Sequence, residues 1–143
     1  MTKIGYTLGC FDVLHIGHIN LLENAKGLCD KLIVGVLDDD YIYKNKKNNM
    51  FCLKDRISLL KAIRYCDVVV PETTLEKMTL WKKYKFDYLF VGDDWMDTEQ
   101  YKKWEKELNE VGCKVIYYPY TKGVCSSNIK NSIKEKWFIH YIY

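Results

Sequence analysis

Proline and long apolar runs are both scarce in this chain. Of its 143 residues only Pro71 and Pro119 are proline, and the sequence has no proline-rich linker, internal repeat or low-complexity tract. No apolar window reaches the roughly 18 residues that a transmembrane helix needs, and the N-terminus lacks the charged-then-apolar pattern of a signal peptide. We therefore expect one cytosolic domain over residues 1–143, without a membrane partner, in which 132–143 form an aromatic C-terminal tail.

An excess of charge of one sign is also missing, and so is any metal-binding cysteine spacing. The formal net charge is only +3, which suits a small anionic substrate better than a nucleic acid, because nucleic-acid binding normally requires a basic stripe. The six cysteines show no CxxC spacing and mostly lie in or beside apolar segments, where a free thiol behaves as a small hydrophobe. We predict no nucleic-acid partner, no disulfide framework and no protein-held metal.

Apolar runs of strand length alternate along the chain with segments of helical periodicity. The five runs that we expect to be strands are Ile4–Leu8, Leu32–Leu37, Val68–Val70, Tyr88–Val91 and Val115–Tyr118. The expected helices are Ile16–Ala25, Leu53–Tyr65, Leu75–Tyr84, Glu99–Val111 and a last one from Ser126 or Ser127 towards Trp137. This alternation is typical of β-α-β units, so we predict an α/β fold with a parallel sheet buried on both faces. A ligand would bind beyond the carboxyl ends of the strands, where the strand order switches.

The stretch from Gly9 to His18 reads GCFDVLHIGH and joins the first strand to the first helix. His15 and His18 are three residues apart at the helix start and share one face, while Gly17 leaves room for a bulky group to approach. A helix N-terminus suits phosphate, and two imidazoles can donate hydrogen bonds or add positive charge as negative charge develops. The alternative is a histidine that only caps the helix or is solvated, but the pair and the preceding Gly-x-Phe-Asp favour phosphoryl or nucleotidyl transfer.

Basic residues follow the second strand and lie on the second helix. The segment Tyr43–Asn49 reads YKNKKNN; its three lysines are either a solvated surface or a flap that closes over a phosphate. Arg56 and Arg64 are eight residues apart, so both could face one direction of the second helix. Arg64 opens the tetrad RYCD, which ends in Asp67.

Polar segments also follow the fourth and fifth strands. After the fourth strand the chain reads GDDW over residues 92–95, where carboxylates would meet the ligand crevice. After the fifth strand it reads TKGVCSSN over residues 121–128 and ends at a helix start. Ser126 and Ser127 are either helix N-caps or, with the preceding glycine, part of a phosphate cradle. The local sequence leaves both interpretations open.

Together these segments resemble the small cytidylyltransferases with an HxGH motif, above all the glycerol-3-phosphate cytidylyltransferase branch. The resemblance covers about residues 4–133. It rests on GCFDVLHIGH, the Lys44/Lys46 loop, Arg56, RYCD, VGDDW and TKGVCSSN, the last of which matches the family pattern R-T-E-G-[IV]-S-[ST]-[ST]. It implies a Rossmann-like, doubly wound, five-stranded parallel sheet with helices on both faces, and a homodimer.

The reaction that the resemblance implies joins CTP to a phosphorylated alcohol, first of all glycerol 3-phosphate, and releases pyrophosphate. The acceptor phosphate is already anionic and needs no general base, so catalysis consists mostly of positioning and charge stabilisation. Mg²⁺ is expected to be bound with CTP because of the nucleotide's charge. The CDP-alcohol product implies a role in cell-surface polysaccharide biosynthesis.

The resemblance also implies residue roles. The implied catalytic residues are His15, His18 and Lys46. The implied nucleotide-binding residues are Gly9, Cys10, Phe11, Asp12, His15, His18, Lys46, Asp94, Trp95, Thr121, Gly123, Ser126 and Ser127. The implied acceptor-binding residues are Lys44, Arg64 and Lys77; Arg64 and Asp67 are otherwise expected to support the active site or a subunit interface.

Two positions depart from the family pattern. Tyr120 replaces the motif arginine and Cys125 replaces the first hydroxyl residue, although neither phenol nor thiol matches the phosphate-binding capacity of the group it replaces. Either another cation compensates, with Lys122 as the candidate, or the triphosphate is held differently. The departures favour a branch that uses a different acceptor: another alditol phosphate, phosphoethanolamine or a phosphonate.

Three other functions share some of these motifs. Adenylyl transfer would share GCFD and HxGH, but GDDW and RYCD favour CTP. A non-catalytic nucleotide-binding module would explain Tyr120 and Cys125, but both histidines are retained. An aminoacyl-tRNA synthetase fragment would share the HIGH tetrad, but its lysine motif would follow the last strand, whereas the similar Lys77-Met78-Thr79 precedes the fourth.

Overall fold

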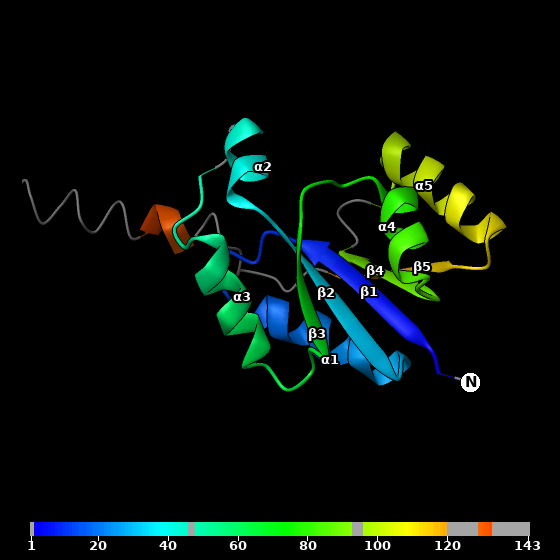
Figure 1. Ribbon diagram of the computed structural model, residues 1–143, viewed down its shortest axis with the longest axis horizontal. Helices are drawn as coiled ribbons and strands as arrows, with labels where there is room; N and C mark the ends of the chain where they lie inside the picture. The colour runs from blue at the N-terminus through cyan, green and yellow to red at the C-terminus, as the bar shows by residue number, and fades with distance from the viewer. Residues whose placement is uncertain (1, 46–47, 93–95, 120–128, 133–143) are drawn as a thin grey trace, which may run out of the picture.

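Five strands form one parallel sheet in the computed structural model, which describes residues 2–45, 48–92, 96–119 and 129–132. The strands are β1 (Ile4–Gly9), β2 (Lys31–Leu37), β3 (Val68–Glu72), β4 (Tyr88–Gly92) and β5 (Lys114–Tyr118). Their order in the sheet is β3-β2-β1-β4-β5, and all four neighbouring pairs are parallel (Figure 1). The predicted Rossmann-like α/β fold is confirmed.

Helices connect the strands and cover both faces of the sheet. They are α1 (Ile16–Leu28), α2 (Asp39–Lys44), α3 (Leu53–Lys61), α4 (Lys77–Tyr84) and α5 (Glu99–Glu110). Helices α1 and α3 pack on one face, and α4 and α5 on the other, as Figure 1 shows. None of the helices in the described ranges is long and apolar enough to cross a membrane.

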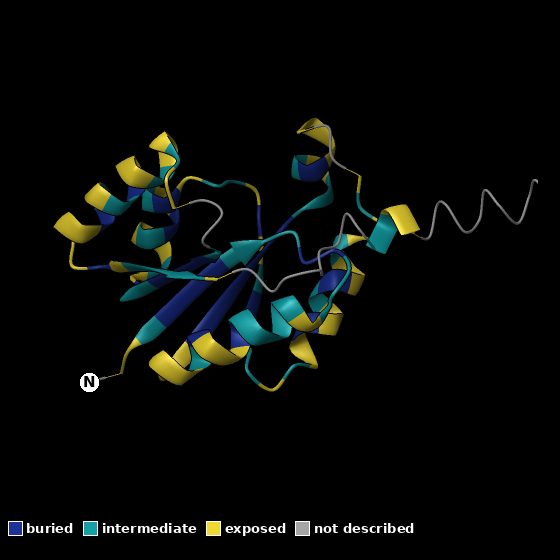
Figure 2. Ribbon diagram, turned by 180° about the vertical axis from the view of Figure 1, so that it is seen from behind, coloured by how far each residue is buried: buried dark blue, intermediate teal, exposed yellow. Residues whose placement is uncertain are grey.

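Two clusters of buried side chains fix these layers. On the α1–α3 face, Leu22 and Leu60 pack against Phe90 and neighbouring strand residues. On the α4–α5 face, Leu80 and Leu108 pack against the other side of the sheet. Figure 2 shows the central strands buried between the two helix layers. Burial on both faces is the reason that these strands are continuous apolar runs rather than alternating ones.

A close approach explains one glycine of the sheet. A Cβ on Gly35, in the middle of β2, would lie 2.2 Å from the hydroxyl oxygen of Tyr6 and 2.9 Å from a methyl carbon of Leu8. Both side chains come from the adjacent strand β1. A glycine at this position therefore lets the large Tyr6 side chain pack across the sheet.

The structure corrects the prediction in the region after β2. Helix α2 was not predicted, because six residues with a single buried side chain, Ile42, show no clear periodicity; Asp38 caps it by accepting a hydrogen bond from the Tyr41 N–H. Helix α3 ends at Lys61 rather than Tyr65. The prediction that Arg56 and Arg64 share one helix face is therefore wrong, because Arg64 lies beyond the end of the helix.

The other helices differ from the prediction only at their ends. Helix α1 continues three residues beyond Ala25, and α4 begins two residues after Leu75. The expected last helix is described only over residues 129–132, which are helical. Its predicted start at Ser126 or Ser127 lies outside the described residues.

The strand order reverses direction at β1. The chain runs outward from β1 through β2 to β3, then returns to the other side of β1 with β4 and continues to β5. The carboxyl ends of β1 and β4 are therefore neighbours at the switch point, where ligands of such sheets bind. The loop from Gly9 to His15 begins there, so the fold carries the histidine motif to the predicted edge.

Candidate active site

The two histidines are held by the first turn of α1. His15 is the N-cap residue, and its Nδ1 accepts a hydrogen bond of 3.0 Å from the Gly17 N–H. The Nδ1 of His18 accepts a 3.2 Å hydrogen bond from the His15 N–H, which completes a capping box. In this box the two imidazoles replace the N-cap hydroxyl group and the carboxylate three residues later that such boxes usually contain. The ring centroids are 4.0 Å apart. Each neutral ring with Nδ1 as acceptor carries its proton on Nε2.

Burial keeps these imidazoles neutral in the free protein. It lowers the pKa of His15 below its usual value. For His18, burial and then the neighbouring charge of His15 lower the pKa to about 4. Near neutral pH the pair therefore presents two uncharged Nε2–H donors. The sequence left two roles open for the pair, hydrogen bonding and positive charge, and the structure favours hydrogen bonding.

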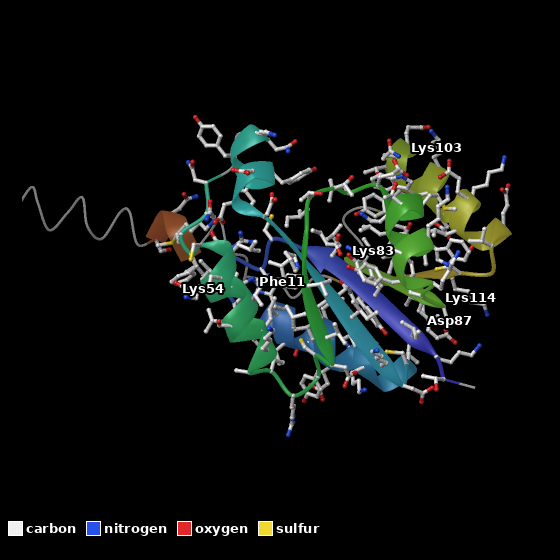
Figure 3. All side chains as sticks on the ribbon, in the orientation of Figure 1. Phe11, Lys54, Lys83, Asp87, Lys103 and Lys114 are labelled. Carbon is white, nitrogen blue, oxygen red and sulfur yellow. The ribbon has the colours of Figure 1, made fainter. Side chains whose placement is uncertain are left out.

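The turn between β1 and α1 has an unusual backbone conformation at Phe11. Its φ of 50° lies in the left-handed region, which is uncommon for a residue with a side chain. The Phe11 ring is buried, and its centroid is 5.5 Å from that of His18. Packing therefore holds the strained turn in place. Figure 3 shows Phe11 at the opposite end of the sheet from Asp87 and Lys114, which mark the amino ends of β4 and β5.

Arg56 is fully buried and joins the ends of two strands to the segment before α3. Its Nη1 donates to the carbonyl oxygens of Cys10 at 2.8 Å and Leu37 at 2.7 Å. Its Nε donates to the Phe51 carbonyl at 3.0 Å, and Nη2 pairs with Asp39 at 2.7 Å. The guanidinium thus supports the loop of the histidine motif through the protein backbone.

The acceptor-binding candidates are only partly brought together. Lys44, the last residue of α2, is exposed on the edge where the strands end. Lys77 is also on this edge, but its Nζ is buried, donates to the Leu75 carbonyl at 2.9 Å and lies 4.5 Å from the centroid of the Trp104 ring. Burial, opposed by the nearby Glu76 charge, lowers the pKa of Lys77 to about 8.

Arg64 and Asp67 lie at the other end of the sheet. Asp67 accepts a hydrogen bond from the N–H of Leu32, at the start of β2, and pairs with Lys26. The exposed Arg64 donates to the Tyr65 hydroxyl. The fold therefore does not bring Arg64 to the histidines, because α3 carries the chain away from the carboxyl edge before Arg64 is reached.

Several predicted site residues lie outside the described residues. They are Lys46, Asp94, Trp95, Tyr120, Thr121, Lys122, Gly123, Cys125, Ser126 and Ser127. Their implied roles stay predictions. Over the described part of the chain, no group of three or more His, Cys, Asp or Glu side chains is arranged to hold a metal ion.

Two residues that organise this edge, Asp39 and Lys130, were not predicted from the sequence. Asp39 accepts hydrogen bonds from the Leu53 N–H and the Asn49 amide and pairs with Arg56. The run of three aspartates directly after a buried strand was the available signal. Lys130 forms an ion pair with Asp12, and no local pattern marks it.

A parallel sheet with paired imidazole donors at its switch point is the arrangement of an α/β protein with a site suited to phosphate groups. The sequence matches the family model described as Cytidylyltransferase-like over residues 6–138. The chain therefore belongs to the cytidylyltransferase-like family.

Individual relatives agree with this assignment. The chain is 36% identical over 132 residues to the glycerol-3-phosphate cytidylyltransferase of Bacillus subtilis (strain 168), covering 89% of this chain and 94% of the relative. It is 39% identical over 116 residues to the FAD synthase of Pyrococcus abyssi, covering 78% and 77%. The solved structure of a lipopolysaccharide core biosynthesis protein from Thermoplasma volcanium is similar with a TM-score of 0.70 and 25% identity, covering 87% of this chain and all of that one.

Proposed function

We propose that this protein transfers CMP from CTP to a small phosphorylated alcohol, with glycerol 3-phosphate as the first acceptor to test, and releases pyrophosphate. The product would be a CDP-alcohol for cell-surface polysaccharide biosynthesis. Similarity to the Bacillus subtilis glycerol-3-phosphate cytidylyltransferase over most of both chains supports the acceptor. The family resemblance supports a homodimer, which sedimentation would test.

The observation that carries the proposal is the fixed orientation of His15 and His18. Both Nδ1 atoms accept hydrogen bonds from backbone N–H groups, so neither Nε2–H group takes part in capping the helix. They belong to the first turn of α1, at the carboxyl end of β1. Such preorganised donors stabilise the charge that develops on a reacting phosphate without reorganising during the reaction.

The chemistry needs little beyond this placement. An oxygen of the acceptor phosphate attacks the α-phosphorus of CTP. The bond between the α-phosphorus and the oxygen that bridges to the β-phosphate breaks, and pyrophosphate leaves with the electrons of that bond. The acceptor is ionised already, so no residue has to remove a proton. CTP would arrive as its Mg²⁺ complex, which makes the ion part of the substrate. The imidazole N–H groups would hold phosphate oxygens in line.

The test is pyrophosphate release with Mg²⁺ and CTP across a panel of acceptors. The panel contains glycerol 3-phosphate, another alditol phosphate, phosphoethanolamine and a phosphonate. Release that requires one of these acceptors supports the proposal and identifies the acceptor. Binding of CTP without release from any acceptor would instead favour a non-catalytic nucleotide-binding module.

A second candidate is adenylyl transfer. It is favoured by the 39% identity to the FAD synthase of Pyrococcus abyssi. The same assay with ATP in place of CTP separates the two candidates. A kcat/KM for CTP that exceeds that for ATP with the preferred acceptor supports cytidylyl transfer, and the reverse order supports adenylyl transfer.

A further inference from the structure

The carboxylate of Asp12 joins three parts of the chain that are distant in sequence. Its Oδ1 accepts a hydrogen bond of 2.9 Å from the Phe51 N–H, and the Met50 N–H lies 3.0 Å from Oδ1 and 2.8 Å from Oδ2. Lys130 forms an ion pair with Oδ2. The Nζ of Lys130 also donates to the Asn48 carbonyl at 2.8 Å. The histidine loop, the segment before α3 and the C-terminal helical residues thus meet at one ion pair.

This ion pair fixes one side of the segment 48–51. On the other side, the Asn49 amide donates to Asp39 at 3.0 Å and to the Phe51 carbonyl at 2.9 Å. The contacts to Asp12 and Lys130 hold the same four residues to the loop that carries the histidines. The position of the segment relative to the histidines therefore depends on Asp12 and Lys130.

The charge of Asp12 poses a problem for binding an anion nearby. Its side chain is only 5% exposed, and it precedes His15 by three residues. A buried carboxylate beside a polyphosphate would repel it strongly, because little water screens the interaction. The two backbone N–H groups supply only partial charges. Lys130, with a side chain that is 19% exposed, supplies the full positive charge.

We propose that Lys130 is a positioning residue of the nucleotide site, which neutralises Asp12 and holds residues 48–51 against the histidine loop so that a nucleoside triphosphate can bind. The inference rests on the proposed function for the identity of the ligand. Lys130 acts through Asp12 and the Asn48 carbonyl rather than on the reacting atoms.

Removing the cation has a consequence that depends on pH. Burial alone would raise the pKa of Asp12, whereas the Lys130 hydrogen bond, the Phe51 and Met50 N–H groups and the Lys130 charge lower it. In Lys130→Met the carboxyl group loses its cationic partner and becomes easier to protonate. As the pH falls towards the pKa of this carboxyl group, protonation removes part of the uncompensated charge. A purely structural defect would not follow this titration.

The experiment compares the KM for Mg²⁺–CTP in Lys130→Met and wild type from pH 8 to pH 5. We expect the variant to raise KM about 10–100-fold at pH 8, with a smaller change in kcat. The ratio of the two KM values should fall as the pH is lowered. Lys130→Arg, which keeps the charge, should restore a KM within a few-fold of wild type.

Lys54→Met is the matched control, because Lys54 is an exposed lysine on α3 (Figure 3). The proposal is overturned if Lys130→Met behaves like this control, if the KM ratio is constant with pH, or if arginine fails to restore binding. Should Lys130→Met not fold, Lys130→Gln, which is shorter and uncharged, is measured in the same way.

A failure of the proposed function would look different. If wild type binds CTP without turnover, the same comparison is made with dissociation constants. If wild type does not bind CTP at all, the proposed function fails. The holding role of Lys130 is then decided by amide hydrogen exchange at Met50 and Phe51: faster exchange in Lys130→Met than in Lys54→Met supports it, and equal exchange overturns it.

Discussion

Replacing Arg56 by methionine tests how the edge of the sheet is held together. The guanidinium is buried and donates four hydrogen bonds, to the carbonyl oxygens of Cys10, Leu37 and Phe51 and to the carboxylate of Asp39. Methionine fills part of the volume but donates none of these bonds. Three carbonyl groups near the site would lose a charged donor.

The magnitude follows from the burial of each partner. Each carbonyl left without a donor in a buried place costs about 1–3 kcal/mol. The Asp39 side chain is 45% exposed, so water screens its charge, and the lost ion pair contributes little to the change in the free energy of unfolding. Relaxation and water entry reduce the sum, and we expect Arg56→Met to lower the free energy of unfolding by about 3–5 kcal/mol. That loss is a large part of the free energy of unfolding of a typical domain, which is about 5–15 kcal/mol.

Urea unfolding followed by circular dichroism measures this loss. The control is Lys54→Met, which removes an exposed cation two residues earlier on the same helix and should change the stability by less than about 0.5 kcal/mol. Arg56→Lys should recover part of the loss, because an ammonium group reaches some but not all of the four acceptors. A loss below about 1 kcal/mol in Arg56→Met would refute the supporting role of the guanidinium.

Three further predictions concern the histidines and the sheet. His15→Ala and His18→Ala should each lower kcat by about 10²–10³-fold with an unchanged far-ultraviolet circular dichroism spectrum; near-normal turnover would contradict the role of that histidine. Because the pKa of His18 is lowered to about 4, the unfolded chain binds more protons between pH 6.5 and 4, and this group should lower the free energy of unfolding by about 3 kcal/mol as the pH falls through that range. An NMR titration of His18 with a midpoint near 6.5 would disprove the shift. Gly35→Ala should cost about 1–3 kcal/mol in urea unfolding, since its methyl group would lie 2.2 Å from the Tyr6 hydroxyl oxygen; unchanged stability would show that the sheet accommodates it.

The strands and the histidine motif were predictable because their signals are local. All five expected strands are present with ends shifted by at most two residues, since a strand buried on both faces must be a short apolar run. The change from strand to helical periodicity between Gly9 and Ile16 located the loop that carries the motif. Helix α2 was missed because one short turn with a single buried residue has no measurable period.

The sequence by itself determined the fold class, the order of the strands and of the four longer helices, and the position of His15 and His18 at a helix start, because periodicity and helix capping act within a few residues. Only the tertiary structure decided which way the cations point: Lys77 turns into the protein, Arg64 lies at the far end of the sheet, and Lys130 pairs with Asp12, which is far from it in the sequence. Such pairings depend on how the strands are ordered and how the loops return to one edge. A buried charge takes the partner that this packing brings within reach, and no local pattern in the chain specifies that partner.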